Sequence, residues 1–210
     1  MKTKSIASLA VLLMASSCNL IESIKPDGKI GGTQSIIGEV GNSFSIGGLS
    51  GVSGFEAEVK TLEDGVSNIN GSITITDTKM REILKTIPEY TWNGNKMTVT
   101  KKYRITDEGI QSVYPDGNFT LVKYDDKVGE KYTHKINGKT IVREVAYKST
   151  EDEYAWGFMD IKIIRVTETG RGLNGVSKLE YILNHKFGLV GFKAYFEDGS
   201  TKEVRFFSKN

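Results

Sequence analysis

The sequence predicts a mainly β protein with a single, strongly curved antiparallel sheet, half-barrel or barrel-like, and one short helix; a two-sheet β-sandwich is the alternative. Thr, Ile, Val, Tyr and Phe are frequent, whereas the chain has only 3 Pro. Asn-Gly and Asp-Gly pairs, typical of tight turns, recur along it. Short runs alternate apolar and polar residues, as in half-buried strands. About ten such strands must curl, close or double over to bury one face.

The closing stretch, residues 189–207, predicts a hairpin around Glu197-Asp198-Gly199. A two-residue loop would set Phe192 opposite Arg205. A three-residue loop with a left-handed bulge glycine sets Phe192 opposite Val204 and gathers the apolar side chains on one face. We therefore expect the bulged hairpin.

A second hairpin is predicted at Asn137-Gly138, the strongest turn signal in the chain. A two-residue turn there pairs His134 with Ile141 and Tyr132 with Arg143. The apolar face of this hairpin is then expected to carry Tyr132, His134, Ile136, Ile141, Val145 and Tyr147.

One helix is predicted in the mature chain, between Asp77 as its N-cap and Pro88 as its stop. Its apolar residues fall at helical spacing and form one stripe: Met80, Ile83, Leu84 and Ile87. A single stripe predicts that the helix packs across one face, or the open mouth, of the sheet.

The first residues, 1–17, are predicted to be a cleaved lipoprotein signal peptide. Two lysines precede an apolar run over residues 6–14, and small residues lead up to Cys18. The run is too short to span a bilayer as a mature helix.

Cys18 is the only cysteine, so no intramolecular disulfide can form. Its setting resembles a bacterial lipobox, and the Ser-Ser-Cys form is similar to that of lipoproteins from gut-commensal Gram-negative bacteria. The resemblance implies acylation of Cys18, palmitate included, which anchors a chain firmly. Asn19 in place of Asp implies the outer membrane, and the lack of a following acidic run favours a periplasm-facing protein over a surface-exposed one.

The mature chain is expected to comprise a lipid-anchored tether over residues 18–32 and a β-rich domain over residues 33–210. Residues 33–54 are Gly-rich and expected to be irregular, with one short strand from Ile36 to Ile46; strands and the helix occupy 55–210. The glycines lack the Lys-Ser/Thr ending of a phosphate loop.

The charge balance argues against a nucleic-acid partner. Removal of residues 1–17 lowers the Lys+Arg count from 28 to 26, equal to the 26 Asp+Glu. A formally neutral mature chain offers no basic footprint for nucleic acid.

No catalytic residue, metal ligand set or cofactor is predicted. The two histidines are His134, on an apolar strand face where a core role is the usual one, and His185, in an expected bend. Zinc-ligand spacing, a nucleophile elbow and a His-Glu-x-x-His motif do not occur in the sequence.

Aromatic residues are the better candidates for ligand contact. Tyr154, Trp156 and Phe158 alternate and would share one face of a strand. With Tyr181 and His134 they are the candidate ligand-binding residues, able to line an apolar cavity or stack on a sugar. The competing interpretation is that they are core residues.

Two segments carry a resemblance to a family. Residues 156–163 look like the Gly-x-Phe strand entry of uncharacterised periplasmic domains of unknown function, and residues 181–190 are similar to their closing Tyr…Gly-Leu-Val strand pair. Those domains resemble half-barrel lipoprotein carriers in shape. The resemblance implies a curved sheet that holds an acyl chain beneath a helical lid.

Three functions are therefore weighed. The first is a non-enzymatic, lipid-anchored envelope protein that binds an apolar or glycan ligand, or an envelope protein, on the concave face of its sheet. The second is a structural or protein-interaction lipoprotein with a filled core. The third is an envelope hydrolase, for which the sequence supplies no motif.

Overall fold

The computed structural model describes residues 26–209. The expected signal peptide, Cys18 and most of the expected tether lie outside the described residues. The rest of the tether lies against the sheet: Asp27 pairs with Asn118, and Ile30 is buried. Gln111 bonds to the backbone on both sides, accepting from the Ile30 N–H and donating to the Gly28 carbonyl.

Within the described residues the protein is mainly β, with one α-helix and one short 3-10 helix. The helices are η1 (Ile36–Gly38) and α1 (Thr78–Lys85). The strands of the first half are β1 (Ser43–Ile46), β2 (Val52–Glu63), β3 (Val66–Ile75), β4 (Thr91–Asn93), β5 (Lys96–Ile105), β6 (Gly109–Tyr114) and β7 (Gly117–Lys123). Those of the second half are β8 (Lys131–Ile136), β9 (Lys139–Lys148), β10 (Tyr154–Trp156), β11 (Met159–Ile161), β12 (Ile164–Thr169), β13 (Val176–Asn184), β14 (Gly188–Phe196) and β15 (Thr201–Ser208).

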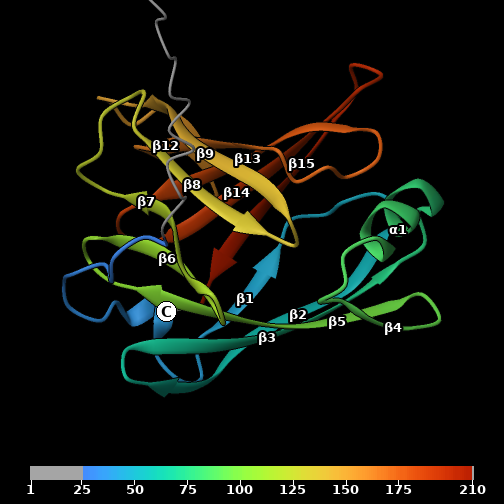
Figure 1. Cartoon of the computed structure of the whole chain (residues 1–210), viewed down its shortest axis with the longest axis horizontal. Helices are drawn as coiled ribbons and strands as arrows, with labels where there is room; N and C mark the ends of the chain where they lie inside the picture. The colour runs from blue at the N-terminus through green and yellow to red at the C-terminus, as the bar shows by residue number, and fades with distance from the viewer. Residues whose placement is uncertain (1–25, 210) are drawn as a thin grey trace, which may run out of the picture.

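Twelve strands form one antiparallel sheet that is nearly closed as a barrel. Their order is β7-β6-β5-β3-β2-β1-β15-β14-β13-β12-β9-β8, and β4 pairs with β5 off this path. The first and second halves of the chain form the two facing walls (Figure 1). This confirms the predicted curved sheet and excludes the sandwich.

The ends of the sheet, β7 and β8, leave one seam without strand pairing. Side chains cross it instead. Arg143 on β9 donates from Nη1 to the carbonyls of Phe119 at 3.1 Å and Thr120 at 3.2 Å on β7. The His134 ring on β8 stacks on Phe119 with 5.3 Å between the ring centroids.

Both predicted hairpin registers are confirmed. Phe192 lies opposite Val204, and Gly199 has the left-handed φ of +81° that the bulged turn requires. At the other hairpin His134 lies opposite Ile141, with φ of 50° at Asn137 and 77° at Gly138. Those angles belong to the turn whose twist matches that of paired strands.

The strand expected over residues 36–46 is wrong in its first part, because only Ser43–Ile46 is extended. Ser35 caps a 3-10 turn, its Oγ accepting from the Ile37 N–H at 3.3 Å. Asn42 then donates from Nδ2 to the Ile37 carbonyl at 2.7 Å and holds the turn closed. Local polar side chains thus outcompete the apolar alternation.

The apolar side chains form two cores. The first lies inside the barrel, around Ile105, Val145, Val166 and Leu183. The second lies between the separate β10–β11 hairpin and β13–β15, around Trp156, Ile161, Ile163, Ile182 and Val190. The outer face of these strands is therefore covered as well.

Helix α1 lies at the open end between the two walls (Figure 1). Asp77 caps it, as predicted, with a carboxylate oxygen 2.8 Å from the Met80 N–H. Asp77 also pairs with Lys202 on β15, and Lys79 pairs with Asp198 at 2.7 Å in the β14–β15 turn. These contacts tie the helix to the far wall.

Candidate binding site at the barrel mouth

A cavity of about 330 Å³ lies between α1 and the concave face of the sheet. The apolar stripe of α1 and the following turn forms one side, through Met80, Ile83, Leu84 and Ile87. The opposite side is formed by Leu179, Phe192, Ala194, Phe196 and Val204 of β13, β14 and β15. No residue of α1 is buried, although the stripe is the face turned toward the sheet. The stripe therefore borders space that no side chain fills.

A second apolar hollow of about 170 Å³ lies farther along the interior, among side chains such as Ile37, Phe44 and Phe206. Tyr103, Leu121 and Tyr181 line both spaces. The two apolar spaces therefore border the same three side chains.

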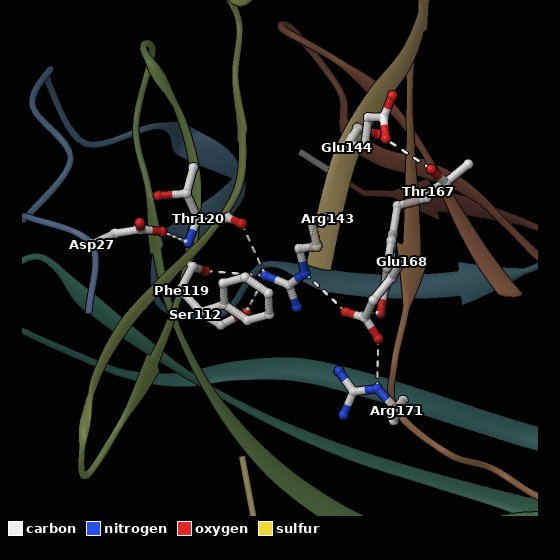
Figure 2. A network of polar contacts seen from close by, with 10 residues as sticks. Asp27, Ser112, Phe119, Thr120, Arg143, Glu144, Thr167, Glu168 and Arg171 are labelled. Atoms are coloured by element: carbon white, nitrogen blue, oxygen red, sulfur yellow. Dashed lines mark hydrogen bonds and ion pairs between the residues drawn. The ribbon is translucent and has the colours of Figure 1, made fainter. Parts of the chain in front are cut away.

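One wall of the cavity carries a buried charge cluster, which we call the Arg143–Glu168–Arg171 cluster (Figure 2). Glu168 accepts from Nε of Arg143 at 2.9 Å and from Nε of Arg171 at 2.5 Å. The Tyr181 hydroxyl donates to the same carboxylate at 3.3 Å. Arg143 and Glu168 are 3% and 1% exposed, whereas the Arg171 side chain is 21% exposed.

The sheet register creates this cluster. Arg143 on β9 lies directly opposite Glu168 on β12. Arg143 lies two residues from Ile141 and two from Val145, and Glu168 lies two residues after Val166. Side chains two residues apart share one face of a strand, so both charged side chains point into the barrel. Their ion pair is fixed by two strands of one sheet.

A turn at Gly170 places Arg171 in the cluster. The φ of Gly170 is +84°, and a Cβ at this position would lie 2.1 Å from the Thr140 carbonyl oxygen. Only glycine fits a left-handed turn so close to another backbone. The turn places the Arg171 guanidinium beside Glu168, three residues earlier.

The cluster is ionised. Burial alone would raise the pKa of Glu168, but the charge of Arg143 and the hydrogen bond from Arg171 outweigh it and hold the pKa below the usual value. Burial would likewise lower the pKa of Arg143, and attraction to Glu168 outweighs it and raises the pKa. Burial raises the pKa of Tyr181, which stays a neutral hydrogen-bond donor.

The candidate residues predicted from the sequence do not lie together. Tyr181 lines the cavity. Tyr154 and Trp156 belong to the second core, outside the barrel. Phe158 follows β10 in the turn to β11, where it is fully exposed, rather than on the expected strand face. His134 is buried at the seam.

His134 has the surroundings of a core residue. Its ring stacks between Tyr114 and Phe119, with centroids 5.7 and 5.3 Å away. Nε2 lies 3.4 Å from a carboxylate oxygen of Asp116, without the geometry of a hydrogen bond. Within residues 26–209, no three His, Cys, Asp or Glu side chains gather where they could hold a metal ion.

Sequence reasoning missed Arg143 and Glu168. The predicted register pairs Arg143 with Tyr132 and so places it on the apolar face of the hairpin, although the set of residues expected on that face does not include it. Glu168 follows Ile164 and Val166 at the same alternation. A charged residue at an inward-facing position was the available signal, because such residues are buried almost only when they are paired.

A larger and more open hollow, of about 840 Å³, lies beside the docked segment around Asp27. Lysines and acidic residues line it together, among them Lys123, Lys148 and Asp125. Lys148 is engaged, donating at 2.9 Å to the carbonyls of both Tyr124 and Asp126. This surface has the character of a solvated groove, so the apolar mouth is the better candidate site.

The chain was compared with known protein families, curated proteins and solved structures, and none of them matches. No helix within residues 26–209 is long and apolar enough to cross a membrane. The function therefore has to be inferred from the geometry of the barrel itself.

Proposed function

We propose that this protein is a lipid-anchored, non-catalytic binding protein of the bacterial cell envelope that takes up an apolar ligand between α1 and the concave face of the sheet. The observation that carries the proposal is the unfilled apolar cavity of about 330 Å³ beneath α1. This is the lower end of the size range of small-molecule sites, which are mostly apolar.

The state of α1 supports the same function. Four apolar side chains on an eight-residue helix and its following turn border the cavity, and no residue of the helix is buried. An apolar ligand would remove this stripe from water, and each Å² of apolar surface buried would stabilise the complex by about 25 cal/mol. Burial of a ligand would thus stabilise both the complex and the helix.

An apolar ligand is favoured over a glycan. Trp156, the largest of the candidate aromatic residues, is not free to stack on a sugar, because two rings already stack on it: the Phe187 centroid is 4.4 Å away and the Phe207 centroid 5.4 Å away. The Trp156 indole N–H is also engaged, with the Phe206 carbonyl at 2.8 Å. Trp156 acts as a core residue of the β10–β11 hairpin.

The test uses N-phenyl-1-naphthylamine, an uncharged dye that fluoresces in apolar surroundings. Ala194 lines the cavity, so A194F fills part of it. Ala155 is exposed on β10, so A155F adds the same group elsewhere. The wild type and A155F should bind the dye, and A194F should bind it at least about tenfold more weakly, a loss of about 1.4 kcal/mol. Equal binding by A194F and A155F, or no binding by the wild type, contradicts the proposal.

The natural ligand is sought by native mass spectrometry of the protein purified from its own envelope. A co-purifying lipid of defined mass supports the proposal. A homogeneous ligand-free protein that also fails to bind the dye favours the alternative, a structural lipoprotein with a filled core.

The anchor is a separate part of the proposal and rests on the sequence around Cys18. C18A should abolish acylation and release the protein into the soluble fraction, because several acyl chains supply the membrane affinity. S17A, which keeps a small residue before the cysteine, should stay in the membrane fraction. Retention of C18A would refute the anchor and leave the cavity proposal untouched.

A further inference from the structure

The wall of the cavity that holds the Arg143–Glu168–Arg171 cluster carries an excess of positive charge. Arg143, Arg171 and Lys101 line the cavity, and Glu168 is the carboxylate that pairs with the two arginines. The other two charged residues of the lining are engaged elsewhere, since Lys202 pairs with Asp77 and Glu203 with Lys193. Lys101 is attracted by Glu89. Within the described residues, two carboxylates thus stand beside two guanidinium groups and one ammonium group, so one positive charge is left over.

The two guanidinium groups keep donors in reserve. Arg143 uses Nε for Glu168 and Nη1 for Ser112, Phe119 and Thr120. Arg171 uses Nε for Glu168. Nη2 of Arg143 and both terminal nitrogens of Arg171 make no hydrogen bond with the residues that the structure describes. An arginine has five N–H donors in a planar fork that fits a carboxylate with two parallel bonds.

Aromatic rings lie beside the Arg143 guanidinium. The Arg143 guanidinium lies over the Phe119 ring at 3.8 Å from its centroid, and over the Tyr181 ring at 5.6 Å. Burial lowers the pKa of Lys101, against the opposing attraction of Glu89. Positive groups in an apolar setting gain most from an anion, because the local dielectric constant is low.

From this geometry we propose that the ligand is a single-chain amphiphile with an anionic oxygen head group of the carboxylate class, held by Arg171 and Arg143, while its apolar chain lies against α1, β13 and β14. Glu168 orients both guanidinium groups through Nε, which leaves Nη2 of Arg143 and the two terminal nitrogens of Arg171 to the ligand. This inference rests on the proposed function, since it names the ligand class of the same cavity.

The experiment compares two probes that share a chain and differ in the head group, dodecanoate and dodecanol. Each is titrated into the protein by calorimetry, dodecanoate below its micelle-forming concentration and dodecanol below its solubility limit, at a pH where dodecanoate is ionised. R171M removes the more exposed guanidinium and spares the buried Arg143–Glu168 pair. R165M is the matched control, because it removes an arginine that does not line the cavity. Arg165 on β12 pairs with Glu180 on β13 at 2.9 Å, on the outer face of the sheet. Thermal unfolding checks that each variant folds.

The wild type and R165M should bind dodecanoate at least about tenfold more tightly than dodecanol, since hydrogen bonds to charged groups are the strong ones. R171M should lose this preference and keep its affinity for dodecanol. Equal binding of both probes by the wild type overturns the inference and leaves the apolar cavity standing, as does a loss in R171M that affects both probes equally. Failure to bind either probe overturns the inference together with the proposed function.

Discussion

Replacement of Glu168 by Gln tests the buried cluster most sharply. The carboxylate accepts from Arg143 at 2.9 Å, from Arg171 at 2.5 Å and from the Tyr181 hydroxyl at 3.3 Å. An amide is nearly isosteric and keeps one acceptor, but it removes the counter-charge of two arginines, one of them 3% exposed. Breaking a buried pair by removing one partner costs roughly 3–5 kcal/mol. We expect E168Q to lose about 3 kcal/mol, because the retained oxygen keeps part of the hydrogen bonding.

Urea unfolding followed by circular dichroism measures this loss. The midpoint should fall with an unchanged slope, and the melting temperature should drop by about 6–12 °C for a chain of this size. E144Q is the matched control: Glu144 pairs with Lys131 at 3.1 Å, and both side chains are about half exposed. It should cost at most about 1 kcal/mol. Equal losses in E168Q and E144Q would refute the claim that the cluster is buried and ionised.

Three further predictions concern Glu168, Asp77 and His134. Since the folded pKa of Glu168 lies below its ordinary value of 4.5, the stabilisation by Glu168 is present above that pH and is lost as the pH falls through the folded pKa. The difference in unfolding free energy between wild type and E168Q, measured by urea unfolding, should therefore narrow below about pH 4.5, and a constant difference would contradict the ion pair. D77A should lower the unfolding free energy by about 1 kcal/mol and weaken binding of the uncharged dye, because it removes the N-cap of α1. D77N still caps α1 and should lose less than half as much; equal losses of unfolding free energy in the two variants would rule out a capping role. H134F should change the unfolding free energy by less than about 1 kcal/mol, because the ring stacks between aromatic residues and Nε2 makes no hydrogen bond; a loss above about 2 kcal/mol would reveal a polar role for His134.

The fold could be predicted from the sequence because its signals are local. Asn137-Gly138 and Glu197-Asp198-Gly199 fix two hairpin registers through their backbone preferences. Asp77 marks the start of α1. The degree of closure was not predictable, since the pairing of β1 with β15 joins opposite ends of the chain, and no local pattern encodes it.

The site could be predicted only in part. Helical spacing indicated that α1 covers a sheet face or mouth, and Tyr181 does line the cavity. The aromatic alternation after Tyr154 gave no sign that a separate β10–β11 hairpin lies outside the barrel. Arg143 and Glu168 are 25 residues apart in sequence, and they meet only because β9 pairs with β12.

The Gly-rich segment shows a second limit. Ile36 and Ile46 bracket an apolar alternation that favours a strand, but Ser35 and Asn42 close a turn by hydrogen bonds to the backbone of Ile37. Periodicity alone does not reveal such competition between side chains and strand pairing.

A crystal structure of the protein with bound dodecanoate tests the central claim most directly. The account predicts the chain between α1 and the concave face of the sheet, with the carboxylate about 2.8 Å from the outer guanidinium nitrogens of Arg143 or Arg171. An empty cavity beneath α1, or a dodecanoate molecule bound only at another surface, would contradict it.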